Sequence, residues 1–204
     1  MEPLPADYFA RPTLEVAPDL LGMWLVRQGE DGTRLVGRVV ETEAYTQDDP
    51  ACHAWGLVDE QTGAIPQDGR GAALFGPPGT AYVYLIYGMH WLLNVVTEPE
   101  GVCGAVLVRA VEPVHGVERM RANRPAARRD VQLTNGPGKL TEAFGIDGAA
   151  HGTDLTAPPL FFAAPGEAPS IEIASSPRIG ISKGTDRLWR FFIDGNRYVS
   201  PAAP

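Results

Sequence analysis

The chain has 204 residues, 44 % of them hydrophobic and 21 % charged, which is typical of a single globular domain and excludes a disordered chain. Its net charge is −8, and residues 1–60 hold twelve of the 25 acidic side chains but only four of the 17 basic ones. No apolar run reaches membrane-spanning length, and the N-terminus lacks the features of a signal peptide, so we expect a cytoplasmic protein. Cys52 and Cys103 are too few for a disulfide framework, and neither belongs to a CxxC pair.

Proline and glycine are spread along the chain, which indicates many short elements joined by turns. In chain order, we expect a helix over 13–22, strands over 23–28 and 34–43, an irregular segment over 46–80, and strands over 81–87, 92–97 and 104–109. After these we expect helices over 114–123 and 139–145 and two or three strands within 155–200, around 171–174 and 188–199. Because strands and helices are mixed without βαβ regularity, we expect an α+β fold in a single domain over 1–204.

Two glutamates and a tyrosine lie at the end of a predicted strand, in the segment VVETEAY at 39–45. The two-residue period of a strand places Val39, Glu41, Glu43 and Tyr45 on one face. A carboxylate beside an apolar strand is suited to act as a general base. The same pattern also fits a surface strand end with ion-paired glutamates, and the motif alone favours that interpretation.

Aromatic and amide side chains are concentrated in YVYLIYGMHWLLNVV, residues 82–96. Tyr82 and Tyr84 share one face of the expected strand, and Gly88 indicates a tight turn that leaves Tyr87 near an exposed tip. Exposed rings beside a turn are suited to wedge between DNA bases or to stack on them. A core cluster is the competing interpretation, in which each polar tip needs a buried partner.

The segment NGPGK at 135–139 combines a glycine–proline turn, a helix start and Lys139. Its backbone N–H groups fit a DNA phosphate, and an ordinary helix cap is the alternative. No histidine shows metal-ligand spacing, so we expect no metal, and His53 is the best functional candidate because its loop follows the two glutamates. The stretches 116–130 and 177–200 each hold five basic residues and two acidic ones, which fits phosphate binding or, more simply, a solvated surface.

Taken together, these segments resemble the alkyladenine (3-methyladenine) DNA glycosylase family. The similarity runs in order along most of the chain, and the combination of ETEAY with YVYxxYGMxxxxNV is highly specific. The matching segments are LLGMWLV at 20–26, GRVVETEAY at 37–45, CHAWG at 52–56, LFGPPGTAYVYLIYGMHWLLNVV at 74–96, VLVRAVEP at 106–113, NGPGKLTEAFGI at 135–146, PRIGI at 177–181 and LWRFFIDGNRYVS at 188–200.

The resemblance implies catalytic and pocket roles for five matching residues. Glu43 is similar to the general base that activates water, and Arg109 to a pocket residue near the reaction centre. Tyr45 and His53 resemble the two walls between which the flipped base is held. Tyr84 resembles a third stacking surface. These are the residues that we expect to carry the reaction.

The resemblance also implies contacts with DNA and a means of selection. Tyr87 is similar to the wedge that enters the space left by the flipped base, and Met89 and His90 to minor-groove contacts beside it. Asn94 resembles a gatekeeper that discourages guanine through its exocyclic amine. Together with Lys139 at the possible phosphate site, these residues define the expected DNA-binding surface.

The family's fold is a curved, mostly antiparallel sheet with short surrounding helices and a protruding β-hairpin. The resemblance implies that the chain flips alkylated or deaminated purines from double-stranded DNA and hydrolyses the N-glycosidic bond, leaving an abasic site. We expect no cofactor, no lyase step because no lysine marks the site, and a monomer associated with the nucleoid. Two alternatives remain: a damage-binding module, which Glu43 argues against, and a nucleosidase, which the tip at Tyr87 argues against.

Overall fold

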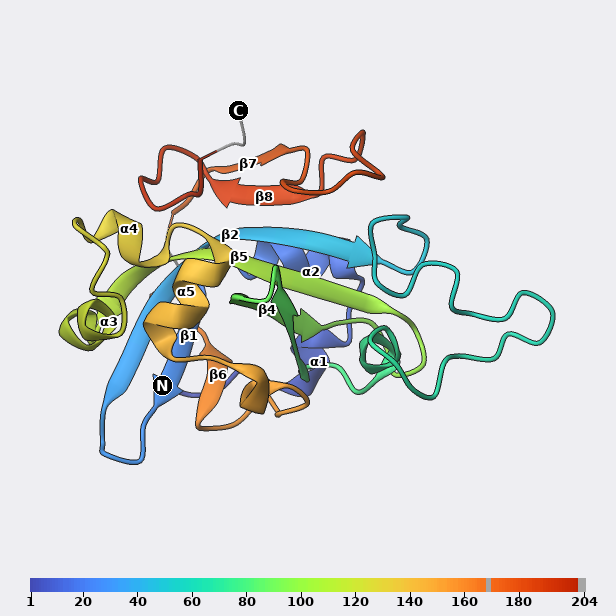
Figure 1. Ribbon diagram of the computed structural model, residues 1–204, viewed down its shortest axis with the longest axis horizontal. Coiled ribbons are helices and arrows are strands. Elements are labelled where there is room, and N and C mark those ends of the chain that lie inside the picture. Colours follow the sequence, from blue (N-terminus) through green and yellow to red (C-terminus); the bar gives the residue numbers. More distant parts are fainter. Residues whose placement is uncertain (168–169, 202–204) are drawn as a thin grey trace.

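A strongly curled β-sheet organises the computed structural model, which describes residues 1–167 and 170–201 (Figure 1). Each strand pairing is antiparallel, in the order β3-β4-β5-β2-β1-β6, while β8 pairs with β2 and with β7. The expected α+β fold around a curved antiparallel sheet is confirmed. The strands are β1 (Trp24–Gln28), β2 (Arg34–Thr46), β3 (Ala81–Ile86), β4 (His90–Val96), β5 (Gly104–His115), β6 (Leu160–Ala163), β7 (Ile173–Ser176) and β8 (Arg190–Ile193).

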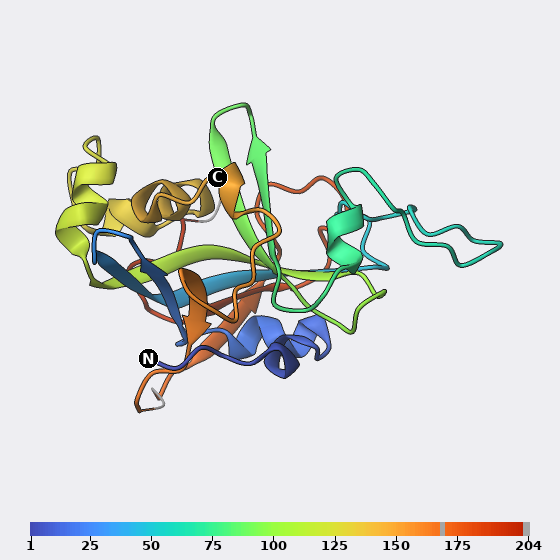
Figure 2. The same ribbon diagram turned by 90° about the horizontal axis from the view of Figure 1, so that it is seen from below.

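Short helices cover the sheet on two sides (Figure 2). Helices α1 and α2 lie on one side of it, and α3, α4 and α5 lie on the other, next to the β3–β4 hairpin. Among the described residues, no helix is long and apolar enough to cross a membrane. The helices are α1 (Ala6–Phe9), α2 (Thr13–Asp19), α3 (Val117–Asn123), α4 (Val131–Thr134) and α5 (Pro137–Phe144), with single 3-10 turns η1 (Ala72–Phe75) and η2 (Gly148–Ala150).

Three elements differ from their expected bounds for physical reasons. The helix expected over 114–123 begins only at Val117, because β5 continues to His115 and Gly116 then turns the chain with a φ of 78°. The helix expected from residue 13 ends at Asp19, one residue after a proline that weakens its last turn. The sequence does not predict strand β6, because all four of its residues are buried and the strand therefore lacks the two-residue alternation of polar and apolar side chains.

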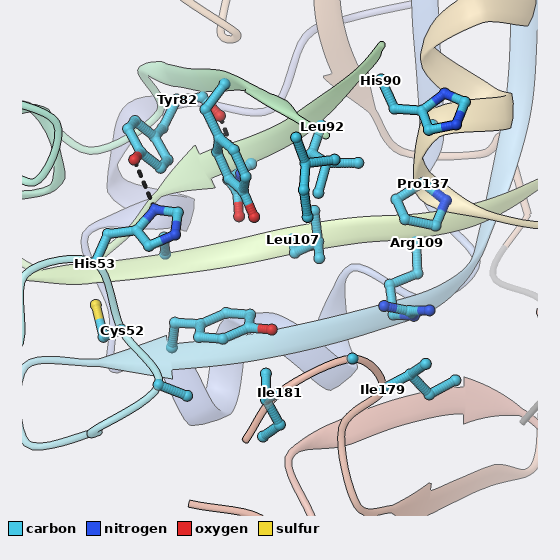
Figure 3. A pocket seen from close by; sticks show the side chains of 18 of the residues that line it. Cys52, His53, Tyr82, His90, Leu92, Leu107, Arg109, Pro137, Ile179 and Ile181 are labelled. Carbon is cyan, nitrogen blue, oxygen red and sulfur yellow. Dashed lines mark hydrogen bonds between the residues drawn. The ribbon is translucent and has the colours of Figure 1, made fainter. Parts of the chain in front are cut away.

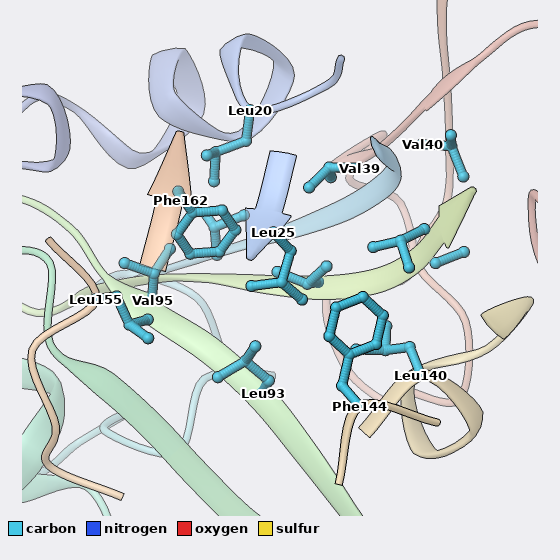
Figure 4. Close-up of a cluster of buried hydrophobic side chains, with 14 of the residues drawn as sticks. Leu20, Leu25, Val39, Val40, Leu93, Val95, Leu140, Phe144, Leu155 and Phe162 are labelled. Atoms are coloured by element: carbon cyan, nitrogen blue, oxygen red, sulfur yellow. The ribbon is translucent and has the colours of Figure 1, made fainter. Parts of the chain in front are cut away.

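The main hydrophobic core lies between the inner face of the sheet and the helices that cover it (Figure 4). Leu20 after α2 and Phe162 of β6 meet there with Leu93 of β4, and Phe144 of α5 closes the opposite side. Each of these side chains is almost completely buried. Burial of one such side chain contributes about 1.5–3 kcal/mol to the stability of the folded state. A core built from β2, β4 and β5 therefore holds the ends of these strands in fixed positions.

Two parts of the chain extend beyond this core. The β3–β4 hairpin rises above the sheet, and the loop between β2 and η1 reaches sideways from it (Figure 2). The hairpin is held at its base because Asn94 pairs with Tyr82 on one side and with Leu107 of β5 on the other. The expected protruding hairpin is therefore present, and its base is continuous with the centre of the sheet.

Candidate active site

A cleft of about 860 Å³ opens above β5, where the β3–β4 hairpin, the loop after β2 and the loop between β7 and β8 meet (Figure 3). The last of these, residues 177–189, is called the C-terminal loop. Its walls come from residues 50–53, from the hairpin, from 136–139 and from 179–183. Eight of the ten expected site residues line it: Tyr45, His53, Tyr84, Tyr87, His90, Asn94, Arg109 and Lys139. The other two, Glu43 and Met89, lie beneath the cleft and on the hairpin tip respectively.

Glu43 is a completely buried carboxylate that Tyr45 and Ile179 separate from the cleft. Its Oε2 accepts a hydrogen bond from the Tyr45 hydroxyl at 2.8 Å, and its Oε1 accepts one from the backbone N–H of Ile179 at 2.8 Å. Burial raises the pKa of Glu43, although Arg109, the Ile179 N–H and the Tyr45 hydroxyl each act to lower it. The interpretation as a surface strand end is wrong, because this glutamate is ion-paired but completely buried.

Arg109 connects Glu43 to the floor of the cleft. Its Nη1 lies 3.1 Å from Oε1 of Glu43, and its Nε donates to Glu41 at 2.9 Å. The ladder between β2 and β5 shifts register between Val39 and Glu41 and again between Glu41 and Thr42, so that Arg109 has no partner residue opposite it. A bulge of this kind changes the direction of a side chain, and here it accompanies an arginine that reaches both glutamates.

Three aromatic side chains, Tyr45, His53 and Tyr84, contribute to the walls of the cleft. Nδ1 of His53 lies 2.8 Å from the hydroxyl of Tyr82, and its ring meets that of Tyr84 edge-on with centroids 4.7 Å apart. Burial, with a smaller effect of Arg70, lowers the pKa of His53 to about 4. The imidazole is therefore neutral at neutral pH.

Two of these rings are covered by arginine guanidinium groups that the sequence analysis did not assign to the pocket. Cζ of Arg70 lies 4.5 Å from the ring centroid of Tyr84, and Cζ of Arg178 lies 4.6 Å from that of Tyr45. Arg178 is itself buried and paired with Asp49. Contacts of this kind contribute about 0.5–2 kcal/mol each and restrain the rings.

Asn94 is buried at the base of the hairpin, where it lines the cleft. Its amide nitrogen donates to the carbonyl oxygen of Tyr82 at 3.0 Å. That bond fixes the orientation of the amide against β3. Asn94 pairs with Leu107 of β5, so the amide and the floor of the cleft belong to one continuous ladder. The expected gatekeeper is therefore a rigid part of the pocket wall.

The hairpin tip carries two exposed apolar side chains. Tyr87 is 81 % exposed and Met89 is 69 % exposed. The backbone N–H of Met89 donates to the carbonyl oxygen of Ile86 at 3.2 Å, and Tyr87 and Gly88 between them have φ values of 53° and 68°. A non-glycine residue with positive φ is uncommon and costs conformational energy. The prediction of an exposed ring beside a tight turn is confirmed.

The segment 136–139 packs directly against the hairpin. A Cβ atom added to Gly138 would come within 2.9 Å of Cβ of His90 and within 3.0 Å of its ring, so only glycine fits beneath this histidine. Lys139 Nζ donates to the side chain of Asn135 at 2.9 Å, and burial lowers the pKa of Lys139, as does Arg124 nearby. His90 and Lys139 therefore share one wall of the cleft, below the exposed tip.

The charge of the cleft differs from that of the whole protein. No acidic side chain is among the described residues that line it, although the protein carries a net charge of −8. A surface lined by cations attracts phosphate even on an acidic protein. The cationic side chains that line the cleft are Arg70, Arg109, Arg124, Lys139 and Lys183, of which Arg109 and Arg124 are ion-paired with glutamates.

Most arginines of the two basic stretches are neutralised within the fold. In 116–130, Arg119 and Arg121 are exposed, as the simpler interpretation expects, whereas Arg178 and Arg190 are buried, so a solvated surface does not describe 177–200. In 116–130 the ion pairs are Arg119–Asp31, Arg121–Asp130 and Arg124–Glu142, and in 177–200 they are Arg178–Asp49, Arg187–Asp48 and Arg190–Glu41. Within residues 1–167 and 170–201, no group of three or more His, Cys, Asp or Glu side chains is arranged to hold a metal ion.

The chain is similar to a family of DNA glycosylases and to bacterial proteins named after that activity. Residues 7–197 match the family described as Methylpurine-DNA glycosylase. The chain is 64 % identical to a protein of Salinibacter ruber, over 100 % of this chain and 99 % of that protein. It is 47 % identical to one of Burkholderia cenocepacia (98 % and 92 %) and 43 % identical to one of Chlorobaculum tepidum (100 % and 93 %). Each of the three is provisionally named a 3-methyladenine DNA glycosylase.

The chain belongs to the methylpurine-DNA glycosylase family. It is therefore a hydrolase of the N-glycosidic bond that acts on DNA in the repair of alkylation damage. Base flipping is general for enzymes of this class, because the reacting bond of a stacked base is out of reach. Family membership gives the activity, and the roles of individual side chains have to be argued from the geometry of the cleft.

Proposed function

We propose that residues 1–204 form a single, monomeric and monofunctional glycosylase domain that excises alkylated or deaminated purines from duplex DNA. The observation that carries this proposal is the position of Glu43, a buried carboxylate directly beneath an aromatic, cation-lined cleft. A carboxylate with a raised pKa in a partly apolar site is suited to take a proton from water. In a bacterial cell we expect the enzyme to act on the nucleoid in the cytoplasm.

Extrusion of the damaged base begins at the hairpin tip. Tyr87 is the most prominent apolar group next to the cleft, and the strained turn directs it away from the body of the protein. Apolar wedges inserted through the minor groove unstack the duplex at a cost of a few kcal/mol per step. In this proposal Tyr87 fills the space of the flipped nucleotide, Met89 and His90 contact the groove beside it, and Lys139 binds a backbone phosphate.

The flipped base is held between aromatic side chains. Tyr45 and Tyr84 offer π-faces, and a cationic alkylpurine on such a face gains about 0.5–2 kcal/mol per ring. His53 is neutral at neutral pH, so it does not repel a cationic base. Asn94 lines the pocket, where its fixed amide disfavours the exocyclic amine of unmodified guanine, while the cationic 7-methylguanine compensates by being a better leaving group.

The chemical step requires water to reach Glu43. Its Oε2 is occupied by the Tyr45 hydroxyl, so that hydrogen bond has to yield before a water molecule takes its place. The water oxygen then bonds to C1′ as the bond from C1′ to the base nitrogen breaks, and one water proton passes to Glu43. The electron pair of the broken bond goes to the base, so a cationic alkylpurine leaves as a neutral molecule and a neutral purine leaves as an anion that takes a proton from solvent. An ionised carboxylate also stabilises the positive charge that develops on the sugar. Arg109, 3.1 Å away, favours the ionised form of Glu43.

The absence of a lyase step is part of the proposal. A lyase step needs an amine that attacks C1′ and forms a Schiff base. Two lysines, Lys139 and Lys183, do line the cleft, although the sequence led us to expect none at the site, and Nζ of Lys139 is hydrogen-bonded to Asn135. Glu43 together with water accounts for cleavage without them.

Single-turnover excision from duplex oligonucleotides, each with one 7-methylguanine, hypoxanthine or ethenoadenine, tests the proposal. The wild-type protein should leave abasic sites that alkali reveals, and borohydride should trap no covalent complex. Glu43→Gln should lose activity by about 10²–10⁴-fold while it still binds damaged duplex. If neither protein cuts any lesion but both bind, the chain is a damage-binding module, and if free nucleosides are the only substrates, it is a nucleosidase.

A further inference from the structure

A second buried glutamate, Glu41, lies behind the proposed base and does not line the cleft. Its Oε1 accepts hydrogen bonds from Nε of Arg109 at 2.9 Å and from Nε of Arg190 at 2.7 Å. Arg109 therefore bridges the two glutamates, with Nε on Glu41 and Nη1 on Oε1 of Glu43. The planar guanidinium has fixed angles between these groups, so the bond to Glu41 sets where Nη1 points.

The C-terminal segment completes the shell around Glu41. The backbone N–H of Ser200 donates to Oε2 of Glu41 at 2.6 Å, and the Ser200 hydroxyl donates to Oε1 at 2.7 Å. Nη2 of Arg190 donates to the Ser200 carbonyl oxygen at 3.0 Å, and β8 pairs Arg190 directly with Glu43 of β2. Residues near position 200 thereby supply hydrogen bonds that β2 and β5 alone do not.

The four charged groups form a balanced buried cluster. Glu41 and Glu43 carry the negative charges, and Arg109 and Arg190 carry the positive ones, with each side chain at most 7 % exposed. Removing one member leaves an uncompensated charge in a site that water does not screen. A change at Glu41 or Arg190 is therefore felt at Glu43, although neither residue contacts the cleft.

We propose that Glu41 is a positioning residue, held by Arg190 and Ser200, which fixes Arg109 against Glu43 and completes the charge balance around it. The inference rests on the proposed role of Glu43 as the base. It assigns a part in the reaction to Arg190 and Ser200, which lie behind the base and do not line the cleft. Glu41 acts through Arg109 and touches neither water nor substrate.

The charges around Glu43 predict the direction in which substitutions at Glu41 and Arg190 shift the pH dependence of the rate. The acid limb is the fall in the single-turnover rate at low pH that follows protonation of Glu43. Removing the negative charge of Glu41 favours the ionised form of Glu43, because Glu41 raises the pKa of Glu43. By Coulomb's law, we expect removal of the positive charge of Arg190, the partner of Glu43 across the ladder, to have the opposite effect. The titratable or charged groups that face or act on Glu43 are Glu41 and Tyr45 of β2, Tyr84 of β3, Arg109 of β5, Arg178 of the C-terminal loop and Arg190 of β8.

The test compares pH profiles of single-turnover excision for Glu41→Gln and Arg190→Gln in the full chain. We expect the acid limb to move to lower pH in the first variant and to higher pH in the second. Glu112→Gln is the matched control, since Glu112 pairs with Arg38 between the same two strands but away from the cleft. It should leave the profile where it is. A purely structural defect lowers the rate at every pH and gives no opposite shifts.

If Glu41→Gln or Arg190→Gln fails to fold, two milder variants at Ser200 test the inference instead. Ser200→Ala removes one hydroxyl from Glu41, and we expect the single-turnover rate to fall about threefold to tenfold with unchanged affinity for damaged duplex. Ser200→Thr keeps the hydroxyl and should restore the rate. Equal rates for both Ser200 variants and the wild type, or shifts of the same sign for Glu41→Gln and Arg190→Gln, overturn the inference. An active Glu43→Gln instead overturns the proposed base, and the inference with it.

Discussion

Nη1 of Arg109 and Oε1 of Glu43 lie 3.1 Å apart, and both side chains are buried between β2, β5 and the C-terminal loop. Burial favours the protonated form of Glu43, and the arginine favours the ionised form. Burial is the larger effect, so the pKa of Glu43 is raised above its ordinary value. The result is a stronger base than an exposed glutamate, held beneath the aromatic pocket.

The first prediction concerns the pH dependence of excision by the wild-type protein. A base works only when ionised, so the rate falls as the pH drops through the pKa of Glu43. Because that pKa is raised, the acid limb should lie at higher pH than an ordinary glutamate produces. Two lesions of different basicity, ethenoadenine and hypoxanthine, separate enzyme from substrate titration, because an acid limb that belongs to the enzyme lies at the same pH for both. A midpoint at or below the ordinary glutamate value contradicts the assignment.

The second prediction isolates the hydroxyl of Tyr45. Tyr45→Phe keeps the stacking ring but removes the donor that holds Oε2 of Glu43 at 2.8 Å. That donor lowers the pKa of Glu43, so its loss raises the pKa and moves the acid limb to higher pH. Above the limb, we expect the rate to be retained or increased, because water no longer competes with the hydroxyl. Tyr45→Leu, which also removes the ring, should in addition weaken binding of the damaged base.

The local sequence predicts those parts of the site that lie within a single strand or turn. The strand end with Glu43 and the turn that exposes Tyr87 follow from a two-residue period and from Gly88. The fold class followed from the mixture of strands and helices, and the resemblance named the residues of the pocket walls. These features depend on neighbours a few residues away in the chain.

Long-range contacts could not be predicted in the same way. Arg109 reaches both glutamates where the β2–β5 ladder is bulged, and no alternation of residue types marks that shift. The N–H of Ile179 that binds Glu43 is 136 residues away in sequence, and Arg178 beside it covers the ring of Tyr45. A single sequence gives the type of these residues but not their partners.

The third prediction tests the contact between the hairpin and α5. Gly138→Ala places a methyl group within 2.9–3.2 Å of His90, so the histidine and its wall of the cleft must shift. Overpacking of this kind costs about 1–3 kcal/mol, which a denaturant titration measures. We also expect weaker binding to damaged duplex. In the double variant Gly138→Ala, His90→Gly, which also removes the Cβ atom 2.9 Å away, the loss of stability should be smaller than the sum of the two single losses.

Gly136→Ala is the control for that variant. It changes another glycine of the same turn, but the nearest atoms to a new Cβ there belong to the flexible Lys139 side chain, at 3.5 Å and beyond. Its stability should stay within about 0.5 kcal/mol of the wild type, as for ordinary surface changes. If both alanine variants lose stability equally, the turn itself and not the contact with His90 is responsible.

The last prediction separates flipping from chemistry at Tyr87. Tyr87→Gly removes the wedge and also relieves a positive φ of 53°, so the hairpin should be no less stable than in the wild type. Excision from duplex DNA should fall strongly, while excision from a single strand, in which no stack has to be opened, should change little. Met89→Ala, at the other exposed tip residue, should have a smaller effect on the duplex. An equal loss on both substrates would mean that Tyr87 acts in the pocket and not as a wedge, because only a wedge distinguishes paired from unpaired DNA.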